Sequence, residues 1–148
     1  METEIRKAEI RKTEISLLRR AKGDLATCKR NLAHWVDEVE IDIAAYHLQQ
    51  ALEKMLKFKL ALQGIPWQFT HDISQLLDHF DTHKISYPHW VDDYSITITQ
   101  FATMTRYGKN LVASTRVLNK IVPLVEEYLQ LLEKEENNET PFSPQNCC

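Results

Sequence analysis

The sequence predicts an all-α protein, an up-and-down antiparallel bundle of about five helices. Glycine occurs only 3 times and proline 5 times in 148 residues, whereas a protein of strands and tight turns would need many more of both. Five segments carry apolar residues at intervals of three or four, the periodicity of an amphipathic helix. With 43% hydrophobic and 26% charged residues, the chain has the composition of one ordinary globular domain that can bury a core.

The first amphipathic segment begins at residue 15. Residues 1–14 contain a five-residue repeat whose isoleucines scatter around a helix instead of forming a stripe, so we expect a loosely held N-terminal helical arm. The helical bundle itself is expected over residues 15–133. Its first helix has one core-facing stripe, formed by Ile15, Leu18, Ala21, Leu25, Cys28, Leu32 and Trp35.

The signals for both ends of a second helix lie between residues 37 and 66. Asp37 followed by Glu40 has the spacing of a capping box. Gly64 suits a left-handed cap, and Pro66 prevents continuation. The apolar residues between these signals form two neighbouring stripes, so this helix should lie at the centre of the bundle.

Polar side chains also occur along the second helix. Glu53 and Lys57 have the favourable i, i+4 order of an ion pair, worth only about 0.2–0.5 kcal/mol on an exposed helix. One of Gln49 and Gln50 lies beside the apolar arc, and a buried glutamine needs hydrogen-bond partners. It can therefore cross-link helices or face a partner subunit.

A short third helix and then a fourth helix are expected between residues 70 and 108. Thr70 is placed to cap the third helix, which contains "HDISQLLDHFDTH". Ser86 with Pro88 opens the fourth helix, whose stripe covers residues 90–107. Gly108 is expected to end it.

The fifth helix is expected around the apolar stripe from Val117 to Leu132. Pro123 lies in the middle of this stripe and removes one backbone hydrogen bond, so a kink or a break is expected there. Residues 134–148 are rich in polar residues and proline, which predicts a disordered tail.

The cysteine content and the hydropathy of the chain indicate where in the cell the protein is located. Three cysteines without framework spacing favour a reducing environment and no structural disulfide. No apolar run approaches the roughly 20 residues of a membrane span, so no membrane association is expected. The expected location is the cytoplasm.

Candidate chemistry is sparse. His79 and His83 lie four apart and share a helix face, but a zinc site needs a third ligand, and a half-exposed helix C-terminus, where histidine suits the dipole, is the better account. We therefore expect no metal and no cofactor. Arg106 and Lys109 lie in a segment without acidic residues between Tyr94 and Val125, which can attract phosphate or form a solvated face.

Two blocks of the sequence resemble the HEPN family (higher eukaryotes and prokaryotes nucleotide-binding domain). The first block is a helix with the pattern aromatic-x-x-Gln-Gln-Ala-x-Glu-Lys-x-x-Lys. After a short loop, the second block contains Thr-His-Asp and then Leu-Leu. The later "TRYG" is similar to the Arg-Tyr-Pro of the family, with Gly108 in place of proline. The matching residues are Tyr46, Gln49, Gln50, Ala51, Glu53, Lys54, Lys57, Thr70, His71, Asp72, Leu76, Leu77, Arg106 and Tyr107.

This resemblance implies a homodimer that is paired with a minimal nucleotidyltransferase. Many members are ribonuclease toxins of toxin–antitoxin pairs and use an Arg-x(4–6)-His motif. No arginine of this sequence has a histidine at that distance; His34 follows Arg30 one residue too early. The sequence therefore favours a protein that is not an enzyme.

Three functions follow from these observations. The first is a non-catalytic dimeric module that binds a nucleotide, another phosphate-bearing ligand or the nucleotidyltransferase partner. The second is a HEPN ribonuclease toxin with a nonstandard pair, such as Arg106 with His71 or His47, acting on RNA. The third is a purely structural dimerisation or adaptor module. The residues expected to line a ligand site are Arg106, Tyr107, Lys109, Lys54 and His71.

Overall fold

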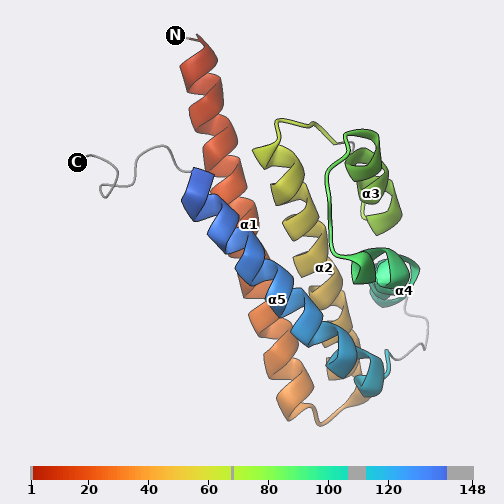
Figure 1. Cartoon of the computed structure of the whole chain (residues 1–148). Helices are drawn as coiled ribbons and strands as arrows, with labels where there is room; N and C mark the ends of the chain where they lie inside the picture. Colours follow the sequence, from red (N-terminus) through yellow and green to blue (C-terminus); the bar gives the residue numbers. More distant parts are fainter. Residues whose placement is uncertain (1, 68, 107–112, 140–148) are drawn as a thin grey trace.

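The computed structural model describes the backbone of residues 2–67, 69–106 and 113–139. Within these ranges the chain forms helices and no strand, which confirms the all-α prediction. The first two helices form an antiparallel hairpin, the fifth crosses them, and the third and fourth lie on the other side of the second (Figure 1). The helices are α1 (Glu2–His34), α2 (Glu38–Leu62), α3 (Ile73–Thr82), α4 (His89–Arg106) and α5 (Thr115–Glu139).

Helix α2 is the centre of the bundle, as its two apolar stripes predict. It packs against α1, α3, α4 and α5. The side chains of Leu48, Leu52, Met55 and Phe58 are 0% exposed. Each such burial stabilises the fold by about 1.5–3 kcal/mol, so α2 is the element on which the other helices depend.

Both predicted ends of α2 are confirmed. The Asp37 side chain caps the first turn, and Glu40 Oε1 accepts the backbone N–H of Asp37 at 3.3 Å, which completes the capping box. At the other end Gly64 has φ 70°. The N–H of Ile65 donates to the carbonyl of Leu60 at 2.9 Å, the six-to-one bond of a Schellman motif.

The predicted cap of α3 is wrong by two residues. The side chain that caps the helix is Asp72, whose Oδ1 accepts the N–H of Ser74 at 2.9 Å. Thr70 lies two residues earlier, and its Oγ1 accepts the N–H of Asp72 at 3.0 Å. The next amide, that of Ile73, donates to Thr99 Oγ1 of α4 at 3.1 Å. The helix therefore starts where both a local carboxylate and a neighbouring helix supply acceptors.

Helix α1 differs from the prediction at its N-terminal end, whereas α4 starts beside the predicted proline. The α1 backbone is one continuous helix from Glu2, so the expected arm and the first bundle helix are a single element that extends past its neighbours (Figure 1). Helix α4 begins at His89, directly after Pro88. In Figure 1 this helix is seen nearly end-on, so it lies across α2 and not along it. Gly108, its predicted end, lies outside the described residues.

Helix α5 is neither broken at Pro123 nor finished at residue 133. It continues through the proline to Glu139, so residues 134–139 of the expected tail are helical. Pro123 is exposed, while Val122 and Val125 on the inner side are buried. A mid-helix proline costs about 3 kcal/mol, which the burial of two such side chains, at about 1.5–3 kcal/mol each, offsets.

The last turns of α5 are held by ion pairs to the first two helices. Lys59 Nζ of α2 lies 2.6 Å from Glu135 Oε2. Lys29 of α1 pairs with Glu126 further back along α5. These contacts link positions far apart in the sequence, so composition alone could not predict where the helix ends.

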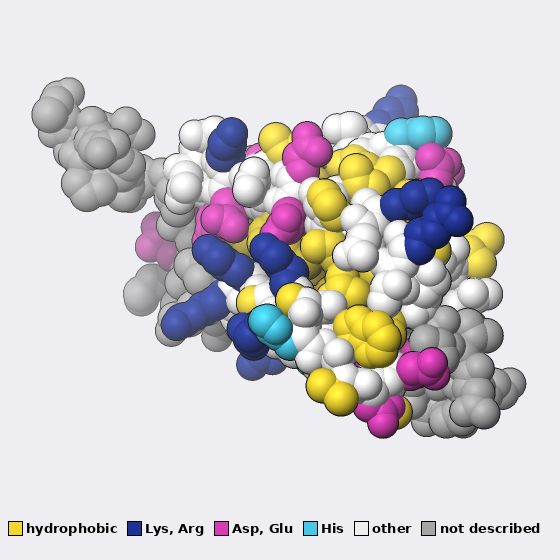
Figure 2. Space-filling model, turned by 90° about the horizontal axis from the view of Figure 1, so that it is seen from below, with side chains coloured by type: hydrophobic (Ala, Val, Ile, Leu, Met, Phe, Trp, Pro, Cys, Tyr) yellow, Lys and Arg dark blue, Asp and Glu magenta, His cyan; other side chains and the backbone are white. Residues whose placement is uncertain are grey.

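The surface is mixed in character. The end of the molecule where α1 meets α2 shows hydrophobic side chains between groups of basic and acidic residues (Figure 2). Three large apolar side chains are exposed at this turn, Trp35 at 44%, Val36 at 88% and Val39 at 60%. In the described part of the chain, none of the helices has the length and apolar character that crossing a bilayer requires.

Candidate functional site

A connected set of polar side chains crosses the bundle along α2. Three of its members are buried, namely Gln49 at 0%, Glu53 at 3% and Lys57 at 9% exposure. They are spaced by four residues and therefore lie in one line on the helix. The set, called here the α2 network, consists of Asp24, His47, Gln49, Gln50, Glu53, Lys54, Lys57 and His71.

Glu53 is the buried carboxylate of the α2 network. Its Oε1 lies 2.8 Å from Nδ1 of His71 and 3.3 Å from Nε2 of Gln49. Its Oε2 lies 3.4 Å from Nζ of Lys57. An ionised carboxylate only accepts hydrogen bonds, so Nδ1 of His71 carries the proton of this contact. The other ring nitrogen, Nε2, makes no hydrogen bond to any residue in the described part of the chain.

Asp24 is a second carboxylate and joins α1 to α2. Its Oδ1 lies 2.9 Å from Nδ1 of His47, and its Oδ2 lies 2.5 Å from Nζ of Lys54. All three side chains are mostly buried, with 15%, 29% and 19% of Asp24, His47 and Lys54 exposed. Each carboxylate of the α2 network thus holds one histidine and one lysine.

Two glutamines connect the carboxylates. Lys54 donates to Gln50 Oε1 at 3.4 Å, and Gln50 Nε2 donates to Gln49 Oε1 at 2.6 Å. Gln49 Nε2 then donates to Glu53 and to the backbone carbonyl of His71 at 3.0 Å. An ammonium group only donates and a carboxylate only accepts, so the two ends of this chain fix the orientation of both amides. The sequence predicted that a buried glutamine cross-links two helices, whereas Gln49 links α2 to the connection that precedes α3.

The charges of the α2 network cancel when the histidines are neutral, because two carboxylates face two ammonium groups. Each histidine that takes a second proton adds one positive charge. Removing one partner of a buried ion pair typically destabilises a protein by about 3–5 kcal/mol, since the other charge is left without compensation. The α2 network therefore holds partly exposed donors, Lys54 and His71, in place, because moving them would leave a buried carboxylate without its partner.

The α2 network contains two of the five predicted ligand residues. Lys54 pairs with Asp24, and His71 pairs with Glu53, and the two glutamines lie between them. Arg106 is the last residue of α4, and its side chain is outside the described part of the structure. Tyr107 and Lys109 also lie outside the described residues. Whether all five residues meet stays a prediction.

Sequence reasoning missed Asp24. The signal was present, because Asp24 follows Ala21 by three residues and precedes Cys28 by four, a register position that faces the core. An acid in that register needs a buried partner, and Lys54 is the partner. Cys28 itself is buried and free, and burial raises its pKa to about 12, so it is an inert core residue.

Phe69 is a further residue that the sequence did not single out. It lies in the connection between α2 and α3 and is 88% exposed. The centroid of its ring lies 5.1 Å from that of His71 in an edge-to-face arrangement. Lys57 Nζ lies 6.0 Å from the centroid of the same ring. An exposed aromatic ring therefore adjoins the half of the α2 network that Glu53 organises.

The histidines considered for a metal do not converge with further ligands. Nδ1 of His83 lies 2.9 Å from the backbone carbonyl of His79, a contact within the end of α3. Among the described residues no group of three or more histidine, cysteine, aspartate or glutamate side chains could hold a metal ion.

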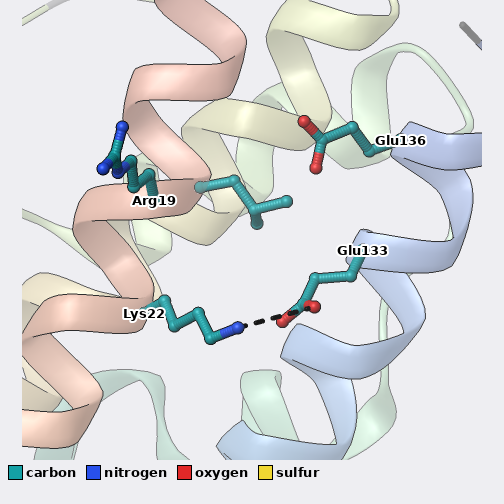
Figure 3. Close-up of a pocket in the computed structure, with 5 residues that line it drawn as sticks. Arg19, Lys22, Glu133 and Glu136 are labelled. Atoms are coloured by element: carbon teal, nitrogen blue, oxygen red, sulfur yellow. Dashed lines mark ion pairs between the residues drawn. The ribbon is translucent and has the colours of Figure 1, made fainter.

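A separate pocket of about 180 Å³ lies between α1 and α5. Arg19 and Lys22 of α1 and Glu133 and Glu136 of α5 line it, and Lys22 points toward Glu133 at 4.0 Å (Figure 3). Burial, and after it the charge of Glu133, raises the pKa of Glu136. The pocket shares no residue with the α2 network, and the ion pair of Lys22 with Glu133 joins its two sides.

Comparison with known proteins gives one match. The family model of the HEPN domain matches residues 16–135. No curated protein and no solved structure matches the chain. The matched range begins within α1, covers α2, α3 and α4, and ends four residues before the end of α5.

Proposed function

The chain belongs to the HEPN domain family, and on that premise we propose that it is a non-catalytic dimeric binding module of the cytoplasm. Its ligand is a nucleotide or another phosphate-bearing molecule, and its protein partner is a minimal nucleotidyltransferase. The observation that carries this proposal is the α2 network, in which largely buried carboxylates hold the partly exposed side chains of Lys54 and His71 in fixed positions.

The α2 network supports anion binding through its donors. The exposed fractions of Lys54 and His71 are 19% and 33%, so both reach the surface while their partners stay inside. Lysine binds phosphate as a compact charge, and a protonated histidine adds a directed N–H. Because the carboxylates already fix these side chains, little conformational entropy is lost on binding.

The charge pattern of the later sequence gives independent support. No acidic residue occurs between Tyr94 and Val125, while Arg106, Lys109 and Arg116 do. Arg116 is exposed in the first turn of α5. A run of like charges raises the local concentration of anions.

The exposed apolar residues support a protein partner. Val36 and Val39 protrude at the α1–α2 turn beside the partly exposed Trp35. Apolar side chains that gather on a surface are typical of protein–protein contacts. The same end of the molecule shows acidic and basic side chains as well as hydrophobic ones (Figure 2), which suits a contact with a specific orientation.

Calorimetric titration with adenine and guanine nucleotides tests the ligand. The wild type should release heat, and Arg106→Ala and Lys54→Met should reduce the affinity, whereas Lys134→Met, an exposed lysine of α5, should not. If no nucleotide gives heat or a thermal shift, the nucleotide part of the proposal is wrong. Sedimentation at several concentrations tests the dimer, and a strict monomer would contradict it.

A ribonuclease is the second candidate, favoured by one observation. Glu53 binds Nδ1 of His71 at 2.8 Å and leaves Nε2 for proton transfer, the arrangement that an acid–base histidine needs. Arg106 of the same or a second copy would position the phosphate. Growth inhibition on overexpression that is relieved by both His71→Gln and Arg106→Ala would favour this candidate, and intact cellular RNA would contradict it.

A further inference from the structure

Where α2 meets the α2–α3 connection, an aromatic side chain is exposed and two charged side chains are buried, the reverse of the usual placement. The aromatic ring of Phe69 is 88% exposed, while Glu53 and Lys57 are 3% and 9% exposed. Stability alone favours the opposite arrangement. A buried ion pair is often no more stabilising than apolar residues of the same volume, and an exposed ring contributes no free energy of burial. Charged groups that are buried at such a cost, beside an exposed aromatic residue, indicate a binding surface.

The contacts of His71 define which of its atoms a ligand would meet. Nδ1 is held by Glu53, and the backbone carbonyl is held by Gln49. The edge-to-face contact between the His71 and Phe69 rings further limits rotation of the His71 side chain. Nε2 therefore has no hydrogen-bond partner among the described residues, and 33% of the side chain is exposed.

The neighbouring helix terminus does not compete for the same ligand. The first amides of α3 are occupied, since Ile73 donates to Thr99 and Ser74 donates to Asp72. The positive charge available here therefore comes from side chains. The charges of Glu53 and Lys57 cancel one another, and the neighbouring Asp72 carboxylate accepts the N–H of Ser74, so the donor that remains for a ligand is a protonated His71.

We propose that Phe69 and His71, positioned by Glu53 and Lys57, form a subsite for an aromatic ring that carries a single phosphate, the chemistry of a nucleoside monophosphate. The ring stacks on the open face of Phe69, and a phosphate oxygen accepts a hydrogen bond from Nε2 of protonated His71. The inference rests on the proposed ligand class and adds where that ligand sits.

Two features of the subsite predict its selectivity. Lys57 Nζ, 6.0 Å from the centroid of the Phe69 ring, draws electron density toward one face and so favours an electron-rich ring on the other. Nε2 of His71 is a single donor and contacts one phosphate group, so further phosphates gain no additional hydrogen bond at this subsite. We expect a monophosphate to bind about as tightly as the triphosphate of the same nucleoside.

The test is calorimetric titration of the full chain with adenosine monophosphate, adenosine and inorganic phosphate at one ionic strength. Phe69→Leu should weaken the monophosphate on the order of tenfold and leave inorganic phosphate unchanged. His71→Gln should weaken both. His89→Gln, an exposed histidine of α4, is the matched control and should change neither. Phe69 and His71 are at the surface, and a thermal melt of each variant verifies that it is folded.

A spectroscopic measurement tests the role of Glu53 separately from affinity. Nitrogen NMR of the His71 ring should report a proton on Nδ1 in the neutral form of the free protein, and Glu53→Gln should alter that signature. The monophosphate should shift the Nε2 resonance and leave the Nδ1 resonance nearly in place. A free protein with the neutral proton on Nε2 would overturn the assigned geometry.

The outcomes separate this inference from the proposed function. If the monophosphate binds, and Arg106→Ala weakens it while Phe69→Leu and His71→Gln do not, the nucleotide module stands and the subsite is wrong. If the wild type binds neither the monophosphate nor the triphosphate, both are wrong. Loss of binding in Phe69→Leu and His71→Gln, with the control unchanged, supports the subsite.

Discussion

The carboxylate of Asp24 on α1 lies 2.5 Å from the ammonium group of Lys54 on α2, thirty residues later in the chain. The same carboxylate holds His47, so one side chain anchors two positions of the central helix. The contact closes the end of the α2 network that is remote from Glu53.

Replacing Asp24 should therefore destabilise the bundle. Asp24→Asn removes the charge that compensates Lys54, and we expect a loss of about 1–3 kcal/mol in the free energy of unfolding. Urea denaturation measures it, with Asp78→Asn, an exposed aspartate of α3, as control. A double-mutant cycle with Lys54→Met should give a coupling energy above about 0.5 kcal/mol; additive effects would contradict a direct interaction.

Gln49→Glu should be among the most damaging single changes to the α2 network. The substitution changes one atom group, but it places a carboxylate in a fully buried position against Glu53 and the carbonyl of His71. We expect a loss of about 3–5 kcal/mol, the cost of an uncompensated buried charge. Gln49→Met is the control and should cost less, because it removes hydrogen bonds without adding charge. Equal losses in thermal melts of the two variants would contradict the assigned amide orientation.

Lys84→Gly should stabilise the protein. Lys84 follows α3 with φ 56°, a left-handed conformation that a residue with a side chain adopts at a cost. The Ile85 N–H to Phe80 carbonyl bond of 2.8 Å shows that the turn is a Schellman motif, in which glycine is preferred at this position. We expect a gain of about 0.5–1 kcal/mol in chemical denaturation. Lys134→Gly, inside α5, should be destabilising.

Tyr128→Phe should be neutral or stabilising by up to about 1 kcal/mol. The hydroxyl of Tyr128 is buried and has no hydrogen-bond partner among the described residues, while its ring packs edge-on to Trp90 at 6.4 Å. Removing an unsatisfied buried hydroxyl relieves a desolvation penalty and keeps the ring contact. Differential scanning calorimetry measures the change. A loss above about 1 kcal/mol would show that the hydroxyl has a partner in solution.

Glu136→Gln should stabilise the protein in a pH-dependent manner. Burial, and then the charge of Glu133, raises the pKa of Glu136 above its ordinary value of 4.5. The stability associated with the protonated form is therefore complete below the unfolded pKa and is lost as pH rises through the folded one. The variant should gain stability over the wild type around pH 7 and lose that advantage around pH 4. Glu127→Gln, an exposed change on the same helix, is the control.

The sequence was informative where structure is encoded locally. The capping box of Asp37 and Glu40 and the cap at Gly64 depend on neighbours within a few residues, so both were found. Thr70 and Asp72 are both good capping residues, and the choice of Asp72 involves Thr99 of α4, which no local pattern contains.

The candidate site depended more on contacts distant in sequence. Lys54, His71 and Glu53 were singled out through the family resemblance, but Asp24, the partner of Lys54, was not, and the pairing of Glu53 with His71 was not predicted. Asp24 meets Lys54 only after α1 has folded back on α2, and the exposure of Phe69 follows from the path of the α2–α3 connection. The extension of α5 past residue 133 likewise reflects its pairing with Lys59.

The position of α5 has a consequence for the order in which the protein is made. The hairpin of α1 and α2 leaves the ribosome first, but one of its sides is covered only by the final helix, which crosses both (Figure 1). Until translation is nearly complete, Leu18, which lines the pocket between α1 and α5, lacks part of its cover. Nascent chains of this protein should therefore be bound by chaperones until α5 docks, and early termination should yield aggregates.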